Sequence, residues 1–331
     1  MTVAIPVRDG GKLLAGTLRA LARQTVAHEL LVCDSGSRDG SVALARAHGA
    51  RVLEIEPGEF GHGATRNLLV REARGVHVAL LTQDSEPADE RWLESLLGGF
   101  ELAGDVGIVY GPYRPRPRAS PAVRRELERW FESLSPDGAP RVERLEEQEL
   151  ALRARELLRG HDWELVGRRG FFTDANACVA RGAWERVPFR EVAYAEDRLL
   201  ALDMLRAGYA KTYVPGAAVL HSHDYTALEH LRRCFDEWRG LREVYGWREP
   251  ASPRRLVRAL RGELGCARRE LILAGVPASR RRAALVGVSY HHGVRLAGAL
   301  LGSRADALPP RVRRGLSLER RAGFSPLDLN E

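Results

Sequence analysis

The sequence contains no run of apolar residues long enough to cross a membrane. A membrane-spanning helix needs about 18 to 20 consecutive apolar residues. The nearest candidate, residues 283–302, is interrupted by His291, His292 and Arg295, so an amphipathic surface helix suits it better. The first residues, MTVAIPV, lack a basic segment followed by an apolar run. We therefore expect no signal peptide and a cytoplasmic position.

Cysteine and lysine are both scarce. The four cysteines, Cys33, Cys178, Cys234 and Cys266, lie far apart and include no C-x-x-C pair. Their spacing argues against a zinc site or a disulfide framework and favours free thiols in a reducing compartment. Lysine contributes only two of the 51 basic residues, so the positive charge of this chain is almost entirely arginine.

The net charge of +7 is concentrated in the last third of the chain. Residues 253–302 contain ten arginines but only two acidic residues, Glu263 and Glu270. Such a segment could meet anionic lipid, nucleic acid or an acidic substrate, or it could be the solvated face of arginine-rich helices. No nucleic-acid reader motif is present, so we expect no nucleic-acid partner.

The first hundred residues alternate between strand-like and helix-like patterns, which is typical of an α/β domain. Apolar runs of strand length are TVAIPV, ELLVCD, ARVLEIE, VHVALLT and DVGIVYG, and segments with helical spacing separate them. This alternation predicts a parallel sheet with helices on both faces. We expect this domain to cover residues 1–225, with two charged helices inserted at 120–160. A basic, mainly helical extension would follow at 226–331.

Polar side chains stand where three of the predicted strands end. Arg8 follows the first strand, Asp34 ends the second, and Gln83 and Asp84 follow the fourth. Ends of parallel strands meet at one edge of a sheet, where ligands bind. Neighbouring acids there repel each other unless a cation or a hydrogen-bonding ligand lies between them. The segment 82–86 is therefore either a solvated turn or part of a ligand site, and the convergence favours the site.

Three further motifs could carry chemistry. In FGHGATRN, Gly61 and Gly63 would let the backbone approach a ligand and Arg66 would suit a diphosphate, unless the motif is only a glycine turn. In AEDR, the two acids at 196 and 197 open a predicted helix. There they could act in catalysis or only complement the helix dipole, an effect worth ~0.5 kcal/mol each. HSHD supplies two imidazoles, at 221 and 223, after the last predicted strand.

The order and combination of these motifs resembles the family 2 inverting glycosyltransferases, which have the GT-A fold. The resemblance covers residues 2–225 and includes VAIPVRDGG, CDSGSRDGS, TQDSEP, AEDRLLALDMLRAGY and the final histidines. FGHGATRN together with LLTQDSEP looks most like bacterial rhamnosyltransferases that use dTDP-rhamnose. The resemblance implies a mixed, mainly parallel sheet. It also implies transfer of a sugar from a nucleotide-diphospho-sugar, and the sugar it favours is L-rhamnose. The acceptor would be a saccharide or lipid-linked saccharide hydroxyl in cell-surface polysaccharide synthesis.

The same resemblance implies roles for individual residues. The catalytic base would be Asp197. Nucleotide and donor contacts would come from Pro6, Arg8, Asp34, Arg66, Gln83 and Asp84. The acceptor or the donor sugar would be contacted by Asn176, Trp184 and Glu196. A divalent cation, Mg²⁺ or Mn²⁺, would be held by Asp84, His221 and His223.

This sequence departs from the family pattern at two places. The D-x-D metal motif reads Gln83-Asp84-Ser85, so coordination rests on one carboxylate. The Q-x-x-R-W motif of processive synthases is absent, which favours transfer of one or a few sugars. Two alternative functions fit the sequence less well. A sugar-nucleotide nucleotidyltransferase would need a G-x-G-T-R-type loop after the first strand, and PVRDGGKLL has no such loop. A non-catalytic scaffold that binds nucleotide-sugar or membrane would not need Asp197.

The basic extension would place the enzyme on the inner face of the cell membrane.

Overall fold

The structure is a computed structural model that describes residues 1–150 and 164–327. The chain divides into two compact units, which we treat separately. The first comprises residues 1–118 and 126–222, and the second comprises 119–125 and 223–331. The second charged helix predicted in the insertion, at 144–158, lies largely outside the described residues.

Within the described residues, eight strands form the main sheet of the first unit, in the order β3-β2-β1-β4-β9-β6-β10-β8. Their bounds are β1 Thr2–Val7, β2 Glu29–Asp34, β3 Arg51–Glu54, β4 His77–Leu81, β6 Val106–Tyr110, β8 Arg141–Glu143, β9 Asn176–Ala180 and β10 Ala210–Tyr213. β9 runs antiparallel between β4 and β6, and β8 runs antiparallel to β10 at the edge. The remaining pairs are parallel, which confirms the predicted mixed, mainly parallel sheet.

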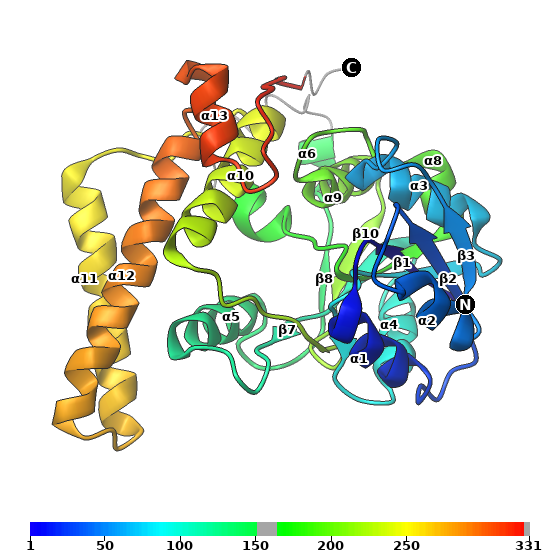
Figure 1. Ribbon diagram of the computed structural model, residues 1–331, viewed down its shortest axis with the longest axis horizontal. Helices are drawn as coiled ribbons and strands as arrows, with labels where there is room; N and C mark the ends of the chain where they lie inside the picture. The colour runs from blue at the N-terminus through cyan, green and yellow to red at the C-terminus, as the bar shows by residue number, and fades with distance from the viewer. Residues whose placement is uncertain (151–163, 328–331) are drawn as a thin grey trace. The chain divides into compact units, whose positions relative to one another are not determined.

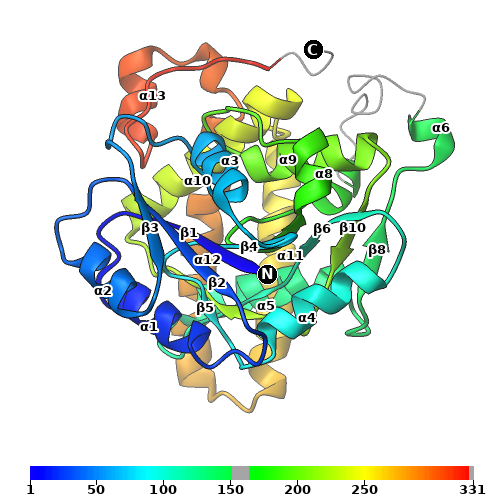
Figure 2. The same ribbon diagram turned by 90° about the vertical axis from the view of Figure 1, so that its right-hand side faces the viewer.

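Helices cover both faces of this sheet (Figure 2). One face carries α3 His62–Glu72, α8 Arg181–Arg186 and α9 Glu196–Arg206, and the other carries α1 Gly11–Leu21, α2 Ser41–Ala47 and α4 Trp92–Gly98. The leucines that predicted the first helix, Leu14, Leu18 and Leu21, are buried against the sheet. α9 stops where its sequence predicts, because Gly208 takes the left-handed conformation, with φ +88°, that a helix end favours.

The charged insertion is not purely helical, which corrects the prediction. It contains the helix α5 Pro121–Leu134, the strand β8 and the short helix α6 Glu147–Leu150. β8 pairs with β10, so part of the insertion extends the main sheet. Two further short helical segments complete the first unit, η1 Gly99–Glu101 and η2 Glu164–Arg169.

A small second sheet lies beyond the ends of the main strands. It consists of β5 Glu86–Pro87, β11 Val219–Leu220 and β7 Tyr113–Arg114. β11 runs antiparallel to β5, with Leu220 opposite Glu86. In such a pair the residue after Leu220 faces the residue before Glu86. The small sheet therefore brings His221 to Ser85 and the adjoining Asp84.

The second unit is helical (Figure 1). Its elements are α10 Ala227–Tyr245, α11 Pro253–Leu273, α12 Ala278–Gly302, η3 Ala305–Ala307 and α13 Pro310–Leu316. α12 packs closely on α10, and a Cβ atom at Gly302 would come within 2.4 Å of the carbonyl oxygen of Phe235. Among the described helices, none has both the length and the apolar composition needed to cross a bilayer.

Candidate active site

The predicted polar strand ends do converge at one edge of the main sheet. β1, β2 and β4 are parallel, so the residues that follow them emerge on the same side. β9 is antiparallel to β4, with Asn176 opposite Leu81, and its first residue therefore lies at that same edge. Asp174, two residues before Asn176, leads into β9 at this edge.

At the end of β2, Asp34 is buried with one carboxylate oxygen lacking a hydrogen bond. Its Oδ2 accepts hydrogen bonds from the backbone N–H groups of Gly36 and Ser37, at 3.0 and 2.9 Å. Its Oδ1 has no partner among the described residues. A buried acceptor without a partner is unusual and marks a place where a ligand donor could bind. Pro6 is half-buried one strand away, and Arg8 is exposed at the strand end.

Gln83 ties two of these strand ends together. Its Oε1 accepts from the backbone N–H of Arg8 at 2.9 Å, and its Nε2 donates to the carbonyl oxygen of Arg8 at 3.1 Å. Its own carbonyl oxygen accepts from the hydroxyl of Thr17 at 3.1 Å. The amide of Gln83, which precedes the one acid of the metal motif, thus holds the end of β1 against the end of β4.

Asp84 and His221 form the pair that the small sheet predicts. The Nδ1 atom of His221 lies 3.6 Å from Oδ1 of Asp84 and 3.2 Å from the hydroxyl of Ser85. The ring of Tyr113 packs against the imidazole, with centroids 4.7 Å apart. A carboxylate oxygen and an imidazole nitrogen at this separation can be ligands of one divalent cation. His223 is the first residue of the second unit, and its role as a third ligand stays a prediction.

A cluster of buried charged residues lies beneath the α3 and α9 helices, and Arg66 is its centre. The guanidinium is held by Asp174, whose Oδ1 accepts from Nη2 at 2.7 Å, and it lies 3.3 Å from Oε1 of Glu196. Nδ1 of His62 lies 3.8 Å from the same Glu196 oxygen. This corrects two predictions. Arg66 pairs with internal acids instead of facing a diphosphate, and Glu196 is buried in an ion pair instead of facing a sugar.

Asp197, next to this cluster, is partly exposed, as His62 is. The pKa of Asp197 is raised to about 6. The larger cause is burial, and the second is the negative charge of Glu196. Burial also raises the pKa of Asp174 well above its usual range, although Arg66 acts in the opposite direction. A carboxylate with a pKa near neutrality can accept and release a proton under physiological conditions. A pKa raised in this way is compatible with the general-base role predicted for Asp197.

The backbone just before Asp197 is strained. Ala195, which precedes the first residue of α9, has φ +65° and ψ 28°, in the left-handed region. For a residue with a Cβ atom this conformation costs about 1–2 kcal/mol. Strain of this kind is found where the surrounding structure holds a functional residue in place. Here it sets the direction from which α9 starts and so the position of Asp197.

Two other predicted sugar-binding residues belong to the core. Asn176 is fully buried, and its Nδ2 donates to the carbonyl oxygens of Pro112 and Ala217 at 3.1 and 2.8 Å. Its Oδ1 accepts from the indole N–H of Trp92 at 2.8 Å. Trp184 is buried and donates its indole N–H to Asn67 at 2.8 Å. Both side chains have protein partners, so their predicted contacts with a sugar do not fit this structure.

The glycine motif also acts within the protein. A Cβ atom at Gly63 would come within 2.5 Å of the carbonyl oxygen of Arg190. The missing side chain therefore lets α3 pack against the segment that leads to α9. The residues that the sequence analysis missed are Asp174, Ser85 and Tyr113. Asp174 left a detectable trace, since it is the one acid in the buried run FFTDANACVA.

Comparison with known proteins agrees with this fold. The sequence profile of Glycosyl transferase family 2 matches residues 2–159. The O-antigen chain rhamnosyltransferase RfbN of Salmonella typhimurium is 30% identical over 244 residues, which are 71% of this chain and 70% of that protein. The O-antigen chain rhamnosyltransferase WbaN of Salmonella anatum is 28% identical over 220 residues, covering 63% of this chain and 61% of the relative.

Among solved structures, the mannosyltransferase PcManGT of Pyrobaculum calidifontis, determined with GDP-Man and Mn²⁺, has a TM-score of 0.56. It is 18% identical, and the match covers 92% of this chain and 85% of that one. At this identity the likeness shows the fold, which is the GT-A fold. With the strand order, the strand-end acids and the relatives taken together, this chain is a glycosyltransferase and belongs to glycosyl transferase family 2.

Proposed function

We propose that this enzyme transfers a hexosyl group from a dTDP-linked donor to an acceptor hydroxyl, with inversion at the anomeric carbon. The hexosyl group that we propose is L-rhamnosyl. The observation that carries the proposed chemistry is the partly exposed Asp197, with its pKa raised to about 6 at the start of α9. The sugar and its use in cell-surface polysaccharide synthesis are supported by the two relatives named as O-antigen chain rhamnosyltransferases.

In the proposed step Asp197 accepts the proton of the acceptor hydroxyl. The acceptor oxygen forms a bond to the anomeric carbon while the bond from that carbon to the diphosphate oxygen breaks. The departing diphosphate keeps the electron pair, and the proton stays on Asp197 until solvent removes it. Attack from the face opposite the leaving group inverts the configuration. General-base catalysis of this type contributes about 10²–10⁴-fold to a rate.

The nucleotide would bind at the ends of β1 and β2. Asp34 has an unused buried acceptor, and a base N–H is a matching donor. Thymine, uracil and guanine all carry such a donor, so Asp34 supports nucleotide binding without selecting the base. Pro6 and Arg8 flank this position, and Gln83 shapes it by holding the Arg8 backbone. Arg66 is left out of the proposed pocket because its guanidinium is buried in ion pairs.

A divalent cation, Mg²⁺ or Mn²⁺, would be held by Asp84 and His221. The donor set fits, because a carboxylate oxygen and an imidazole nitrogen already lie 3.6 Å apart. His223 follows His221 by two residues in the chain and would be the third ligand. When bound, the cation would stabilise the negative charge that develops on the diphosphate. The acceptor would be a saccharide, free or lipid-linked, and the enzyme would act on the inner face of the cell membrane.

The donor is tested by offering the purified enzyme dTDP-, UDP- and GDP-sugars in parallel. Thermal-shift measurements report binding, and release of nucleoside diphosphate reports turnover. We expect dTDP-rhamnose to give the largest shift and the fastest turnover. A clear preference for a UDP- or GDP-sugar would exclude the rhamnose assignment while leaving the enzyme class intact.

The base is tested by Asp197→Asn, which keeps the size and most of the polarity of the side chain. The variant should bind the nucleotide with wild-type affinity in calorimetry and should transfer the sugar about 10³-fold more slowly. Proton NMR of the wild-type product should show the anomeric configuration opposite to that of the donor. Retained configuration, or transfer by Asp197→Asn at the wild-type rate, would refute the proposed step.

A further inference from the structure

The last long helix of the second unit exposes a continuous apolar face. Along one side of α12, Ala283, Val286, Tyr290, Gly293, Ala297 and Leu301 recur every three or four residues. This spacing places them on a single face of the helix. Val286 is 69% exposed and Tyr290 58% exposed, so the face points into solvent. We call these six residues the apolar band.

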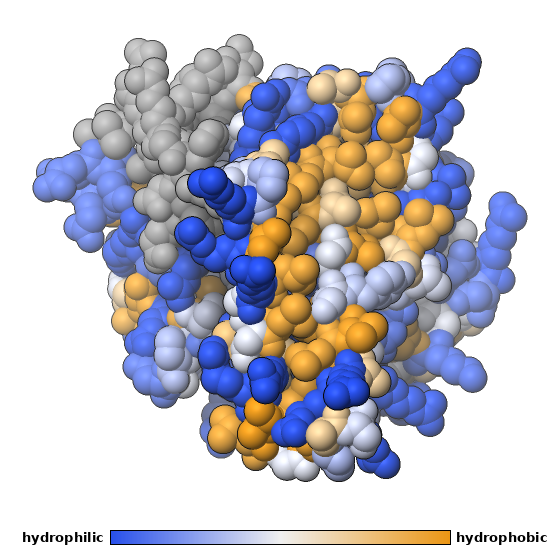
Figure 3. All heavy atoms as spheres, turned by 90° about the vertical axis from the view of Figure 1, so that its left-hand side faces the viewer, coloured by the Kyte–Doolittle hydropathy of each residue, from blue (hydrophilic) through white to orange (hydrophobic). Residues whose placement is uncertain are grey.

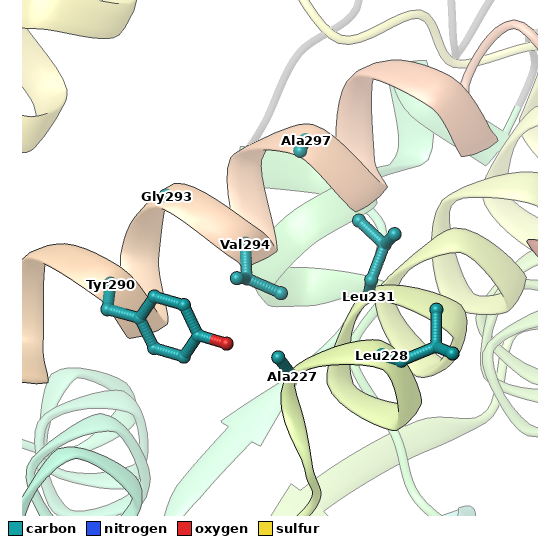
Figure 4. A pocket seen from close by; sticks show the side chains of 7 residues that line it. All are labelled: Ala227, Leu228, Leu231, Tyr290, Gly293, Val294 and Ala297. Carbon is teal, nitrogen blue, oxygen red and sulfur yellow. The ribbon is translucent and has the colours of Figure 1, made fainter.

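The band is widened by a shallow groove between α12 and α10. The groove has a volume of about 490 Å³ and is lined by Leu228 and Leu231 of α10 and by Tyr290 and Val294 of α12. Figure 4 shows Tyr290 and Val294 directed toward α10 across this groove. Among the residues that the structure describes, no charged side chain lines it. The groove therefore continues the apolar surface instead of forming a polar ligand site.

The tip of the α11–α12 hairpin combines apolar and basic side chains. Leu273, at the end of α11, is 87% exposed, and its neighbour Ile272 is 46% exposed. Five arginines stand within a few residues of this tip: Arg268, Arg269, Arg280, Arg281 and Arg282. Figure 3, which faces the hairpin, shows apolar side chains running along it with hydrophilic side chains on either side. An apolar strip bordered by arginine is typical of helices that lie in a membrane interface.

The acidic residues of the hairpin do not offset this positive charge at the surface. Glu263 and Glu270 are its two acids, against ten arginines. Both are ion-paired with Arg125, which belongs to the same unit. Glu263 also lies 3.6 Å from a ring nitrogen of His292. The arginines near the tip therefore determine the sign of the charge that the hairpin presents.

We propose that the apolar band and the tip of the α11–α12 hairpin form a docking surface for an anionic lipid bilayer. The hairpin would lie in the plane of the interface, with the band in the acyl region and the arginines among the phosphates. A second copy of this chain fits the surface less well. A two-fold pairing with the two hairpins parallel would bring the arginine clusters of the two copies toward each other, and like charges repel.

This proposal rests on the proposed function for its purpose, since a lipid-linked acceptor would be presented at such a surface. The binding itself needs neither donor nor acceptor. It is therefore measured on the full-length chain alone, by flotation with vesicles of phosphatidylcholine, with and without phosphatidylglycerol. We expect binding to the phosphatidylglycerol vesicles, little binding to phosphatidylcholine alone, and release as salt is raised.

Two pairs of variants separate the apolar and basic contributions. Leu273→Glu and Val286→Glu should each lower vesicle binding at least about ten-fold, because each places a carboxylate in the acyl region. Val76→Glu is the matched control, because Val76 is 73% exposed but lies in the first unit. Arg280→Gln with Arg282→Gln should lower binding by about five-fold per arginine. Arg19→Gln with Arg23→Gln, at two exposed positions of the first unit, should not.

The outcomes distinguish this surface from the catalytic proposal and from self-association. Asp197→Asn should bind vesicles like the wild type, so loss of transfer and loss of docking are separate results. Circular dichroism should show unchanged helix content in Leu273→Glu and Val286→Glu. The proposal is overturned if the wild type does not bind anionic vesicles, or if Val286→Glu binds them as strongly as the wild type does. It is also overturned if analytical ultracentrifugation shows an oligomer that Val286→Glu dissociates while vesicle binding is absent.

Discussion

Asp84 and Asp197 are two carboxylates at the same edge of one sheet, and their surroundings differ in kind. Asp84 lies beside the imidazole of His221 and the neighbouring hydroxyl of Ser85. Asp197 lies next to Glu196, which is buried and paired with Arg66. A carboxylate among lone-pair donors is suited to binding a cation. A carboxylate beside another buried acid is suited to binding a proton.

The difference also concerns how each site is stabilised. The buried cluster combines Arg66 of α3, Glu196 of α9 and Asp174, which precedes β9. These three charged side chains are largely shielded from solvent. The Asp84 region is closer to solvent, and its neighbouring arginine, Arg116, lies 3.7 Å from Glu86 and donates to the backbone carbonyl of Asp84. Removing a charge from the first site should therefore affect folding, whereas removing one from the second should affect ligand binding.

The largest effect is expected for Arg66→Met. Removing the cation leaves Asp174 and Glu196 buried beside each other, and breaking a buried ion pair costs about 3–5 kcal/mol. Arg116→Met is the matched control at the more exposed site and should cost about 1 kcal/mol or less. Urea unfolding followed by circular dichroism measures both. Equal losses of free energy of unfolding would show that the two sites are stabilised in the same way.

Asp197→Asn should lower the rate of transfer by about 10³-fold, within the range for a lost general base. Asp203→Asn is the control on the same helix, because Asp203 is paired with Arg190 and faces no substrate in the proposed step. It should leave the rate within about three-fold, which is under 1 kcal/mol of activation free energy. Single-turnover kinetics at saturating donor measures both. A comparable loss in both variants would point to a structural role for the α9 acids.

His221→Ala should raise the Mn²⁺ concentration needed for half-maximal binding by about ten- to hundred-fold, the range seen when a metal site loses a supporting group. The readout is calorimetry with Mn²⁺ and nucleoside diphosphate, which does not require turnover. His48→Ala, at the end of α2, is the control and should behave like the wild type. If His221→Ala binds Mn²⁺ normally, the proposed cation set is wrong.

The smallest expected effect is a shift in pH dependence. Asp197 acts as a base only when it is deprotonated, so the transfer rate should fall as pH drops below about 6. Glu196→Gln removes the like charge that raises this pKa, and the acid limb should therefore move to lower pH, by about one unit or less. Glu191→Gln, an exposed neighbour, should leave the profile unchanged. A shift to higher pH would contradict the assigned cause.

Local patterns predicted the frame of the site because they depend on short-range chemistry. The period-two runs located the strands, and Asp34 and Asp84 could be placed at one edge because parallel strands emerge together. The end of α9 at Gly208 followed from the same local rule. His221 could be paired with Asp84 only through the family resemblance, since the pairing of β11 with β5 spans more than a hundred residues.

The roles of Arg66, Glu196 and Asn176 could not be predicted for a related reason. Arg66 meets Asp174 across 108 positions of sequence, and nothing near Arg66 indicates that partner. Only the family resemblance placed Asn176 at the sugar, but β9 enters the middle of the sheet, so its amide is surrounded by backbone carbonyls. Pairing between residues far apart in the sequence therefore determines which polar side chains are hydrogen-bonded within the protein and which can contact a ligand.

The central position of β9 has a consequence for how the chain is made. Until the ribosome has released residues 176–180, β4 and β6 have no strand between them, and each keeps an unpaired edge. Unpaired edges are templates for wrong association. A nascent chain that stops near residue 159, where the family match ends, would thus hold the four-stranded piece β3-β2-β1-β4, while β6 and β8 would still lack the strands they pair with. Such a fragment should need a chaperone, and it would make a poor stand-alone domain.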